Sequence, residues 1–178
     1  DGFLVTLVEM GANIKIMNRR QNAGELVADI RVIYSPNLTG VEVPKQRSAK
    51  MIDEYPILSM VAAIANGPTI MKGIRELRYK ESDRINAVAK GLIDSGVDVI
   101  EGEDMLVVNG KSRKNIEGGS QIHASNDHRI AMSFACLGLI SKKGIKVNGA
   151  TSINTSFPNF VDLMNLIGAI VIVPKRTT

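Results

Sequence analysis

Five consecutive residues combine the charges and the hydroxyl group that acid–base and phosphate chemistry need: Lys80, Glu81, Ser82, Asp83 and Arg84. Residues 85–93 follow with apolar side chains at the i, i+3, i+4 spacing of an amphipathic helix. Ser82 or Asp83 can cap that helix. The start of the helix then presents free N–H groups and the positive end of a dipole beside Lys80, Glu81 and Arg84. This arrangement predicts a binding site for a phosphorylated anion.

A second basic helix opening lies at Asn126, Asp127, His128 and Arg129, ahead of the apolar residues 130–140. Either opening alone is also typical of an ordinary helix cap with a surface charge. Two such openings in one chain favour a functional site.

The composition limits the classes of partner. The chain has 178 residues, 44% hydrophobic and 22% charged, which is enough for one well-buried globular domain. Its net charge of +4 suits acidic ligands, but the Lys and Arg residues are scattered and aromatic residues make up only 4%. We therefore expect no nucleic-acid partner. No apolar run approaches the roughly 18 residues of a membrane span, so we expect a soluble protein without a membrane partner.

Cys136 is the only cysteine and lies in an apolar run, which predicts a buried core thiol and fits a reducing compartment. His123 and His128 are the only histidines and lack the spacing of zinc ligands, so we expect no metal site. The chain begins at Asp1 without methionine and enters a helical pattern almost at once. We therefore expect it to be a piece of a longer polypeptide.

A repeat determines the expected architecture. Helical patterns end at Gly11, Gly96 and Gly168, and each is followed by a β-branched strand pattern. Glycine suits the left-handed residue that ends a helix, so we expect a positive φ at each of the three positions.

A second element repeats in phase with the first. Residues 53–65 and 127–140 each form an apolar helical pattern opened by aspartate, and strand patterns follow at 69–71 and 145–147. Polar helix openings come next, at residues 81–83 and 155–158. The unit therefore reads strand, helix, strand, helix, strand, strand, with further strands expected at 26–34, 105–108 and 171–173. Because the two aspartate-opened helices are apolar nearly all round, we expect them inside the domain with sheets outside.

Equivalent helices in stacked repeats should begin at the same end of the domain. We therefore expect Asp53, Glu81, Asp127 and Arg129 to converge on one surface. Such a set of cations, carboxylates and free N–H groups can bind phosphate and carboxylate groups and transfer protons. The sequence has no nucleophile-elbow, P-loop or dinucleotide-binding signature that would favour other chemistry.

Four segments in this order resemble the 5-enolpyruvylshikimate-3-phosphate synthase family: residues 52–56, 76–84, 126–132 and 155–158. The resemblance extends through the whole chain. It implies an α/β protein with two domains, each an inside-out α/β barrel of three βαβαββ units with buried parallel helices. Residues 1–178 would form most of the C-terminal domain, and the N-terminal domain is absent from this chain.

The resemblance also implies an activity, that of the glyphosate target in aromatic amino-acid biosynthesis. This activity transfers the enolpyruvyl group of phosphoenolpyruvate to the 5-hydroxyl of shikimate 3-phosphate and releases phosphate through a tetrahedral intermediate. No metal or organic cofactor is implied. We expect a cytoplasmic enzyme that is monomeric when whole, with the missing N-terminal domain as the partner of this chain. The chain alone should be inactive.

The matching motifs assign the carboxylates and the lysine. Asp53 would contact the hydroxyls of shikimate 3-phosphate and serve as a catalytic base, and Glu81 would handle the methylene proton of phosphoenolpyruvate as the second catalytic carboxylate. Which carboxylate takes which proton stays open. Lys80 would bind shikimate 3-phosphate beside its reacting hydroxyl.

The same motifs assign the phosphoenolpyruvate contacts. Arg84 and Arg129 would bind phosphoenolpyruvate, because planar guanidinium groups suit its carboxylate and phosphate. His128 would support Arg129, contact the leaving phosphate or have a purely structural role. Some relatives carry a lysine where this chain has Thr155 and Ser156, so one contact is absent or supplied elsewhere.

Two alternatives remain. A UDP-N-acetylglucosamine enolpyruvyl transferase shares the fold and chemistry but usually relies on a cysteine in a loop, whereas Cys136 falls in a helical pattern. A non-catalytic anion-binding module would fit the missing domain. Asp53 and Glu81 argue against this second alternative, because an anion binder gains nothing from negative charge at its site.

Overall fold

The middle of the chain forms one complete strand–helix–strand–helix–strand–strand unit. The structure is a computed structural model that describes residues 1–112 and 115–174. The unit comprises β3 (Glu42–Val43), α2 (Tyr55–Ile64), β4 (Asn66–Lys72), α3 (Arg84–Asp94), β5 (Asp98–Glu101) and β6 (Met105–Lys111). Its strands form one sheet in the order β3-β4-β6-β5, in which β3 is parallel to β4 and β6 is antiparallel to both its neighbours. The expected unit is therefore confirmed.

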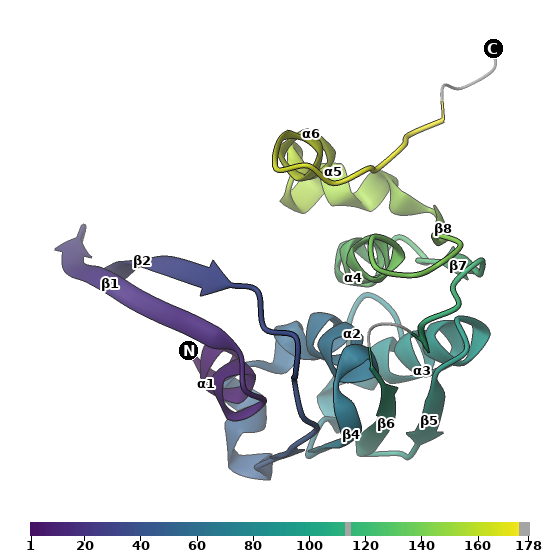
Figure 1. The fold of residues 1–178 in the computed structure, drawn as a ribbon, viewed down its shortest axis with the longest axis horizontal. Coiled ribbons are helices and arrows are strands. Elements are labelled where there is room, and N and C mark those ends of the chain that lie inside the picture. Colours follow the sequence, from purple (N-terminus) through teal and green to yellow (C-terminus); the bar gives the residue numbers. More distant parts are fainter. Residues whose placement is uncertain (113–114, 175–178) are drawn as a thin grey trace.

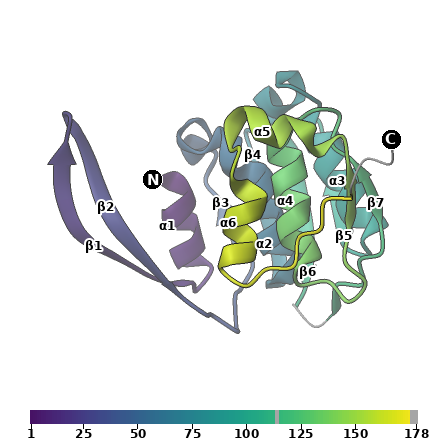
Figure 2. The same cartoon turned by 90° about the horizontal axis from the view of Figure 1, so that it is seen from above.

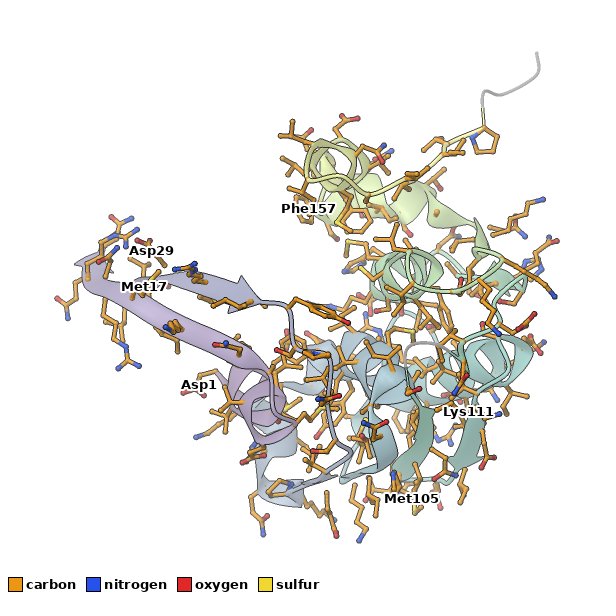
Figure 3. The ribbon with its side chains drawn as sticks, in the orientation of Figure 1. Asp1, Met17, Asp29, Met105, Lys111 and Phe157 are labelled. Carbon is orange, nitrogen blue, oxygen red and sulfur yellow. The ribbon has the colours of Figure 1, made fainter. Side chains whose placement is uncertain are left out.

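Incomplete units flank this complete one. On the N-terminal side, α1 (Gly2–Glu9) precedes the antiparallel hairpin of β1 (Asn13–Asn22) and β2 (Glu25–Ile33). The hairpin projects from the rest of the molecule, with Met17 and Asp29 opposite each other on its two strands (Figures 1 and 3).

The C-terminal side continues the pattern. Its elements are β7 (Gln121–His123), α4 (His128–Gly138), β8 (Lys146–Asn148), α5 (Ile153–Ser156) and α6 (Phe160–Leu166). Strands β7 and β8 are parallel, as β3 and β4 are in the complete unit. Short 3-10 helices connect the larger elements: η1 (Lys45–Lys50), η2 (Ile52–Glu54), η3 (Arg75–Tyr79) and η5 (Ala150–Ser152).

Helix α2 lies at the centre of the domain. Its apolar residues are buried on almost every side, with the sheet on one side and α4 on the other (Figures 1 and 2). Two glycines allow this close packing. A Cβ atom at Gly110 of β6 would lie 2.3 Å from the carbonyl oxygen of Ala65, and one at Gly91 of α3 would lie 2.2 Å from Cζ of Phe134 in α4. The expected arrangement of buried helices with sheets outside is confirmed.

The predicted helix ends are confirmed, and one predicted strand is wrong. Gly11, Gly96 and Gly168 all have a positive φ, of 93°, 86° and 95°. Residues 171–173 form no strand. The backbone N–H and carbonyl of Val171 are instead bonded to the side-chain amide of Asn165, at 2.8 and 3.0 Å, so this segment pairs with a side chain rather than with a strand.

Helix α2 begins two residues later than expected. Asp53 lies in η2 and does not cap α2, whose first residue is Tyr55. Pro56 is in the first turn, where its missing N–H has no partner to lose. In the described part of the chain, no helix has the length and apolar character needed to cross a membrane.

Candidate functional site

The beginnings of α3 and α4 and the 3-10 helix η2 meet around Arg84. This arginine is the first residue of α3, and only 1% of its side chain is exposed. Its Nε donates to Oδ2 of Asp127 at 2.8 Å, its Nη1 to Oδ1 of Asp53 at 3.0 Å and its Nη2 to Oε2 of Glu81 at 2.5 Å. Three segments that are far apart in sequence are thus joined by one guanidinium group.

Asp127 holds this guanidinium from inside the protein, because its carboxylate is fully buried. It caps α4 by accepting from the N–H of Arg129 at 2.9 Å, and it accepts from the Ser82 hydroxyl at 2.9 Å. Burial by itself raises the pKa of Asp127, but the hydrogen bonds and charge of Arg84, with help from Ser82 and the N–H of Ile130, outweigh it and hold the pKa below its usual range. Asp127 is therefore an interior anchor, whereas the sequence placed it on a surface.

Asp53 lies among all three cations of the site. Besides Arg84, its carboxylate is 3.6 Å from Nζ of Lys80 and 3.6 Å from Nη2 of Arg129. Its backbone carbonyl accepts from Nη1 of Arg129 at 3.0 Å. The side chain is 36% exposed, so it is open to solvent while its orientation is fixed by charge.

Two further carboxylates, which sequence reasoning missed, face the site. Glu76 lies 2.6 Å from Nζ of Lys80, and Glu54 lies 3.6 Å from Nη1 of Arg129. The hydrogen bond that Lys80 donates to Glu76 raises the pKa of Lys80; partial desolvation opposes this effect and the charge of Asp53 adds to it. The spacing of four residues between Glu76 and Lys80 is a signal that could have revealed the first pair.

The expected convergence of Asp53, Glu81, Asp127 and Arg129 is observed, and carboxylates outnumber cations in the cluster. Among the described residues, three cations (Lys80, Arg84, Arg129) face five carboxylates (Asp53, Glu54, Glu76, Glu81, Asp127), a formal charge of −2. Every one of these carboxylates pairs with a cation.

Side-chain caps also occupy N–H groups that were expected to be free. Asp83 accepts from the N–H of Asn86 at 3.0 Å at the start of α3, which confirms the predicted cap. Asp127 does the same for the N–H groups of Arg129 and Ile130 at the start of α4. An anion at this site would therefore depend on the cationic side chains more than on free N–H groups at the two helix starts.

His128 is the first residue of α4 and is partly exposed. Within residues 1–112 and 115–174 its side chain makes no hydrogen bond or ion pair. In this part of the chain, His128 therefore does not hold Arg129 in place through a polar contact. Thr155 is exposed and donates to the carbonyl of Ser152 at 2.7 Å, its one side-chain hydrogen bond within the described residues.

A shallow apolar groove of about 220 Å³ adjoins the charged cluster. Asp53 and Arg129 of the cluster line it together with Cys136 and Phe157. Phe157, labelled in Figure 3, belongs to the segment between α5 and α6 that lies above α4. Cys136 is partly buried rather than fully buried as expected, and burial raises the pKa of its thiol. The described residues contain no group of His, Cys, Asp and Glu side chains that could hold a metal ion.

Comparison with known proteins identifies a matching family and similar individual proteins. Residues 2–164 match the family described as EPSP synthase (3-phosphoshikimate 1-carboxyvinyltransferase). The 3-phosphoshikimate 1-carboxyvinyltransferase of Cereibacter sphaeroides is 54% identical over 95% of this chain, and that of Roseobacter denitrificans is 51% identical over 94%. In both comparisons the chain spans 37% of the relative's length.

Solved structures agree with the sequence relatives. An EPSP synthase from Acinetobacter baumannii superimposes with a TM-score of 0.93 at 38% identity, over 98% of this chain and 40% of that one. The enolpyruvyl transferase NikO from Streptomyces tendae superimposes with a TM-score of 0.67 at 18% identity, over 97% of this chain and 37% of that one, which shows a shared fold.

Proposed function

The chain belongs to the EPSP synthase family, and from this premise we propose that it supplies part of an active site that converts phosphoenolpyruvate and shikimate 3-phosphate to the 5-enolpyruvyl product and phosphate. The observation that carries the proposal is the junction at Arg84. It brings together the residues of three family-like segments, through Asp53, Glu81 and Asp127. Such a cluster of cations and carboxylates suits both the binding of anions and the transfer of protons.

We further propose that residues 1–178 form most of one domain of a two-domain enzyme. The chain spans 37% of the length of these relatives, which leaves room for a further domain. The face between α1 and the hairpin is apolar and exposed, with Val5, Val8, Leu26 and Ile30 on it. This face suits contact with the part of the enzyme that lies outside the chain.

The proposed chemistry has two proton transfers. The 5-hydroxyl oxygen of shikimate 3-phosphate adds to C2 of phosphoenolpyruvate while C3 gains a proton, and the tetrahedral intermediate then loses phosphate and one C3 proton. Glu81, in its protonated form, is proposed to give a proton to C3 in the first step and, as the carboxylate, to take one back in the second; Asp53 is proposed to accept the proton of the hydroxyl. Lys80, close to Asp53, stabilises the negative charge that develops on the attacking oxygen.

The guanidinium groups are proposed to bind phosphoenolpyruvate. Arg129 is about one-third exposed beside Asp53, and its planar group can hold a carboxylate or phosphate through two parallel hydrogen bonds. Arg84 is proposed as the second contact. His128, at the start of α4, is proposed to face the leaving phosphate. No metal or organic cofactor is proposed, and this absence stays a prediction.

The −2 formal charge of the cluster supports the proposal that these residues act together with a part of the enzyme outside the chain. Two anionic substrates would bind weakly to these residues alone, so we propose that the absent domain supplies further cations. The whole enzyme is proposed to be a monomeric cytoplasmic protein.

Phosphate release tests the proposal. The chain would be assayed with shikimate 3-phosphate and phosphoenolpyruvate, alone and joined to the preceding portion of the Cereibacter sphaeroides relative. We expect release only from the joined protein, and a loss of about 100-fold or more on Glu81→Gln if Glu81 acts as acid–base catalyst. A folded joined protein that binds both substrates without releasing phosphate would instead favour the anion-binding module.

A further inference from the structure

Arg84 is covered by its carboxylate partners. Its side chain is 1% exposed and donates to Asp53, Glu81 and Asp127, the last of which accepts from both Nε and Nη2. An anionic ligand from solvent therefore cannot reach the guanidinium while all three carboxylates stay in place. It has to replace one of them.

Asp127 is the least replaceable partner. It is fully buried, and its oxygens also accept from the Ser82 hydroxyl and from the N–H groups of Arg129 and Ile130. Moving it would leave several buried donors without an acceptor, which is costly.

Asp53 is also held in place from several directions. Lys80 and Arg129 lie within 3.6 Å of its carboxylate, and its carbonyl binds Arg129 at 3.0 Å. Displacing this carboxylate would disturb three cations at once.

Glu81 has a different environment. It lies in the bend that precedes α3, outside any helix, and 48% of its side chain is exposed. Among the described residues, its carboxylate has one ion-pair partner, Nη2 of Arg84 at 2.5 Å. Rotation of this side chain into solvent breaks one ion pair and leaves Nη2 of Arg84 with only its 3.3 Å contact to Oδ1 of Asp127.

We propose that Glu81 is an exchangeable counterion of Arg84, which the phosphate or carboxylate of the ligand displaces from Nη2. The inference rests on the proposed function, in which phosphoenolpyruvate is that ligand. The inference adds one step to that function. The arriving anion releases the Glu81 carboxylate from its ion pair, so that Glu81 can act on the substrate. Charge favours the exchange. The cluster already has more carboxylates than cations, so an anion that binds Arg84 would be repelled by Glu81 if Glu81 stayed in place.

Binding of phosphoenolpyruvate and of inorganic phosphate to the joined protein described above, measured by calorimetry, tests the exchange. Glu81→Gln removes the competing charge, so we expect it to bind phosphoenolpyruvate about tenfold more tightly than the unmodified joined protein. Glu76→Gln is the matched control: it removes the same charge from a carboxylate that pairs with Lys80 instead. We expect it to change the affinity by about twofold or less.

A double variant locates the exchange at Arg84. On an Arg84→Lys background, Glu81→Gln should no longer tighten binding, because the two residues act as one pair. Circular dichroism checks folding. If Arg84→Lys does not fold, the NMR signal of the Arg84 Nε–H is followed in the unmodified protein instead. This signal should shift on addition of phosphoenolpyruvate.

Several outcomes would reject the exchange: equal or weaker binding by Glu81→Gln, an equal gain from Glu76→Gln, a gain that persists with Arg84→Lys, or no binding by any variant. Phosphate release by the joined protein is scored separately. Release without the predicted gain in affinity leaves the enzymatic function standing and rejects the exchange. The gain without release supports the exchange and rejects the enzymatic function.

Discussion

Arg84 and Asp127 form a buried ion pair, with Nε of the arginine 2.8 Å from Oδ2 of the aspartate and neither side chain more than 1% exposed. The pair ties the start of α3 to the start of α4. Desolvating two charges is costly, so a buried pair contributes little net stability compared with apolar residues of the same size. Removing one partner is a different matter, because the other charge is then left buried.

Asp127→Asn should accordingly destabilise the chain by about 3–5 kcal/mol, the usual cost of breaking a buried ion pair. Urea denaturation followed by circular dichroism measures this. Asp53→Asn is the matched control, since it removes a carboxylate from the same guanidinium at a 36% exposed position, and it should cost about 1 kcal/mol or less. Equal losses from the two variants would show that burial does not determine the strength of these contacts.

The lowered pKa of Asp127 also predicts a pH dependence. The unfolded chain holds the Asp127 proton up to a pH of about 3.9, whereas the folded chain releases it at a lower pH. Its contribution to stability is therefore complete above the unfolded pKa and is lost as the pH falls through the folded pKa.

Urea midpoints between pH 7 and pH 3 check this dependence. The unmodified chain should lose stability more steeply below pH 4 than Asp127→Asn, which lacks the titrating group. Parallel slopes for the two chains would rule out Asp127 as a source of acid sensitivity.

The sequence-based predictions agree with the structure for features that neighbouring residues determine. They differ from it for features that depend on tertiary packing. The starts of α3 and α4 and the glycine ends of the helices follow from caps and backbone freedom, which neighbouring residues determine. The burial of Arg84 does not follow from its neighbours, because it depends on how closely α3 approaches α4. The failure of the strand at 171–173 has the same origin, since a β-branched run needs a partner strand as well as propensity.

The Tyr55 hydroxyl gives a test at the opposite end of the pH range. It lies 3.2 Å from Ser48 Oγ inside the core, and burial raises its pKa although Ser48 and Arg47 pull it down. A raised pKa contributes stability below the unfolded value of about 10, which is lost as the pH rises through the folded value.

Tyr55→Phe should therefore cost about 1 kcal/mol at pH 7, through the lost hydrogen bond, and should reduce the loss of stability above pH 10. Thermal unfolding at pH 7 and pH 10.5 measures both. Ser48→Ala is the control, since it removes the same hydrogen bond but keeps the phenol that titrates. If both variants retained the full alkaline loss, Tyr55 would not be its source.

Gly91 determines how closely α3 can approach α4, and so whether Arg84 can reach Asp127. A methyl group there would lie 2.2 Å from Cζ of Phe134, far inside contact distance. In an open helix, Gly→Ala gains about 1 kcal/mol of helix propensity. In this position overpacking opposes the gain, and we expect Gly91→Ala to destabilise the chain by about 1–3 kcal/mol.

The steric explanation predicts a specific rescue. Phe134→Leu shortens the side chain that the new methyl group meets, so the double variant Gly91→Ala/Phe134→Leu should lose less stability than the sum of the two single variants. Urea denaturation of the four chains measures this coupling. Additive losses, or a Gly91→Ala chain that is more stable than the parent, would show that Phe134 yields to the methyl group and that Gly91 is not what fixes the spacing of α3 and α4.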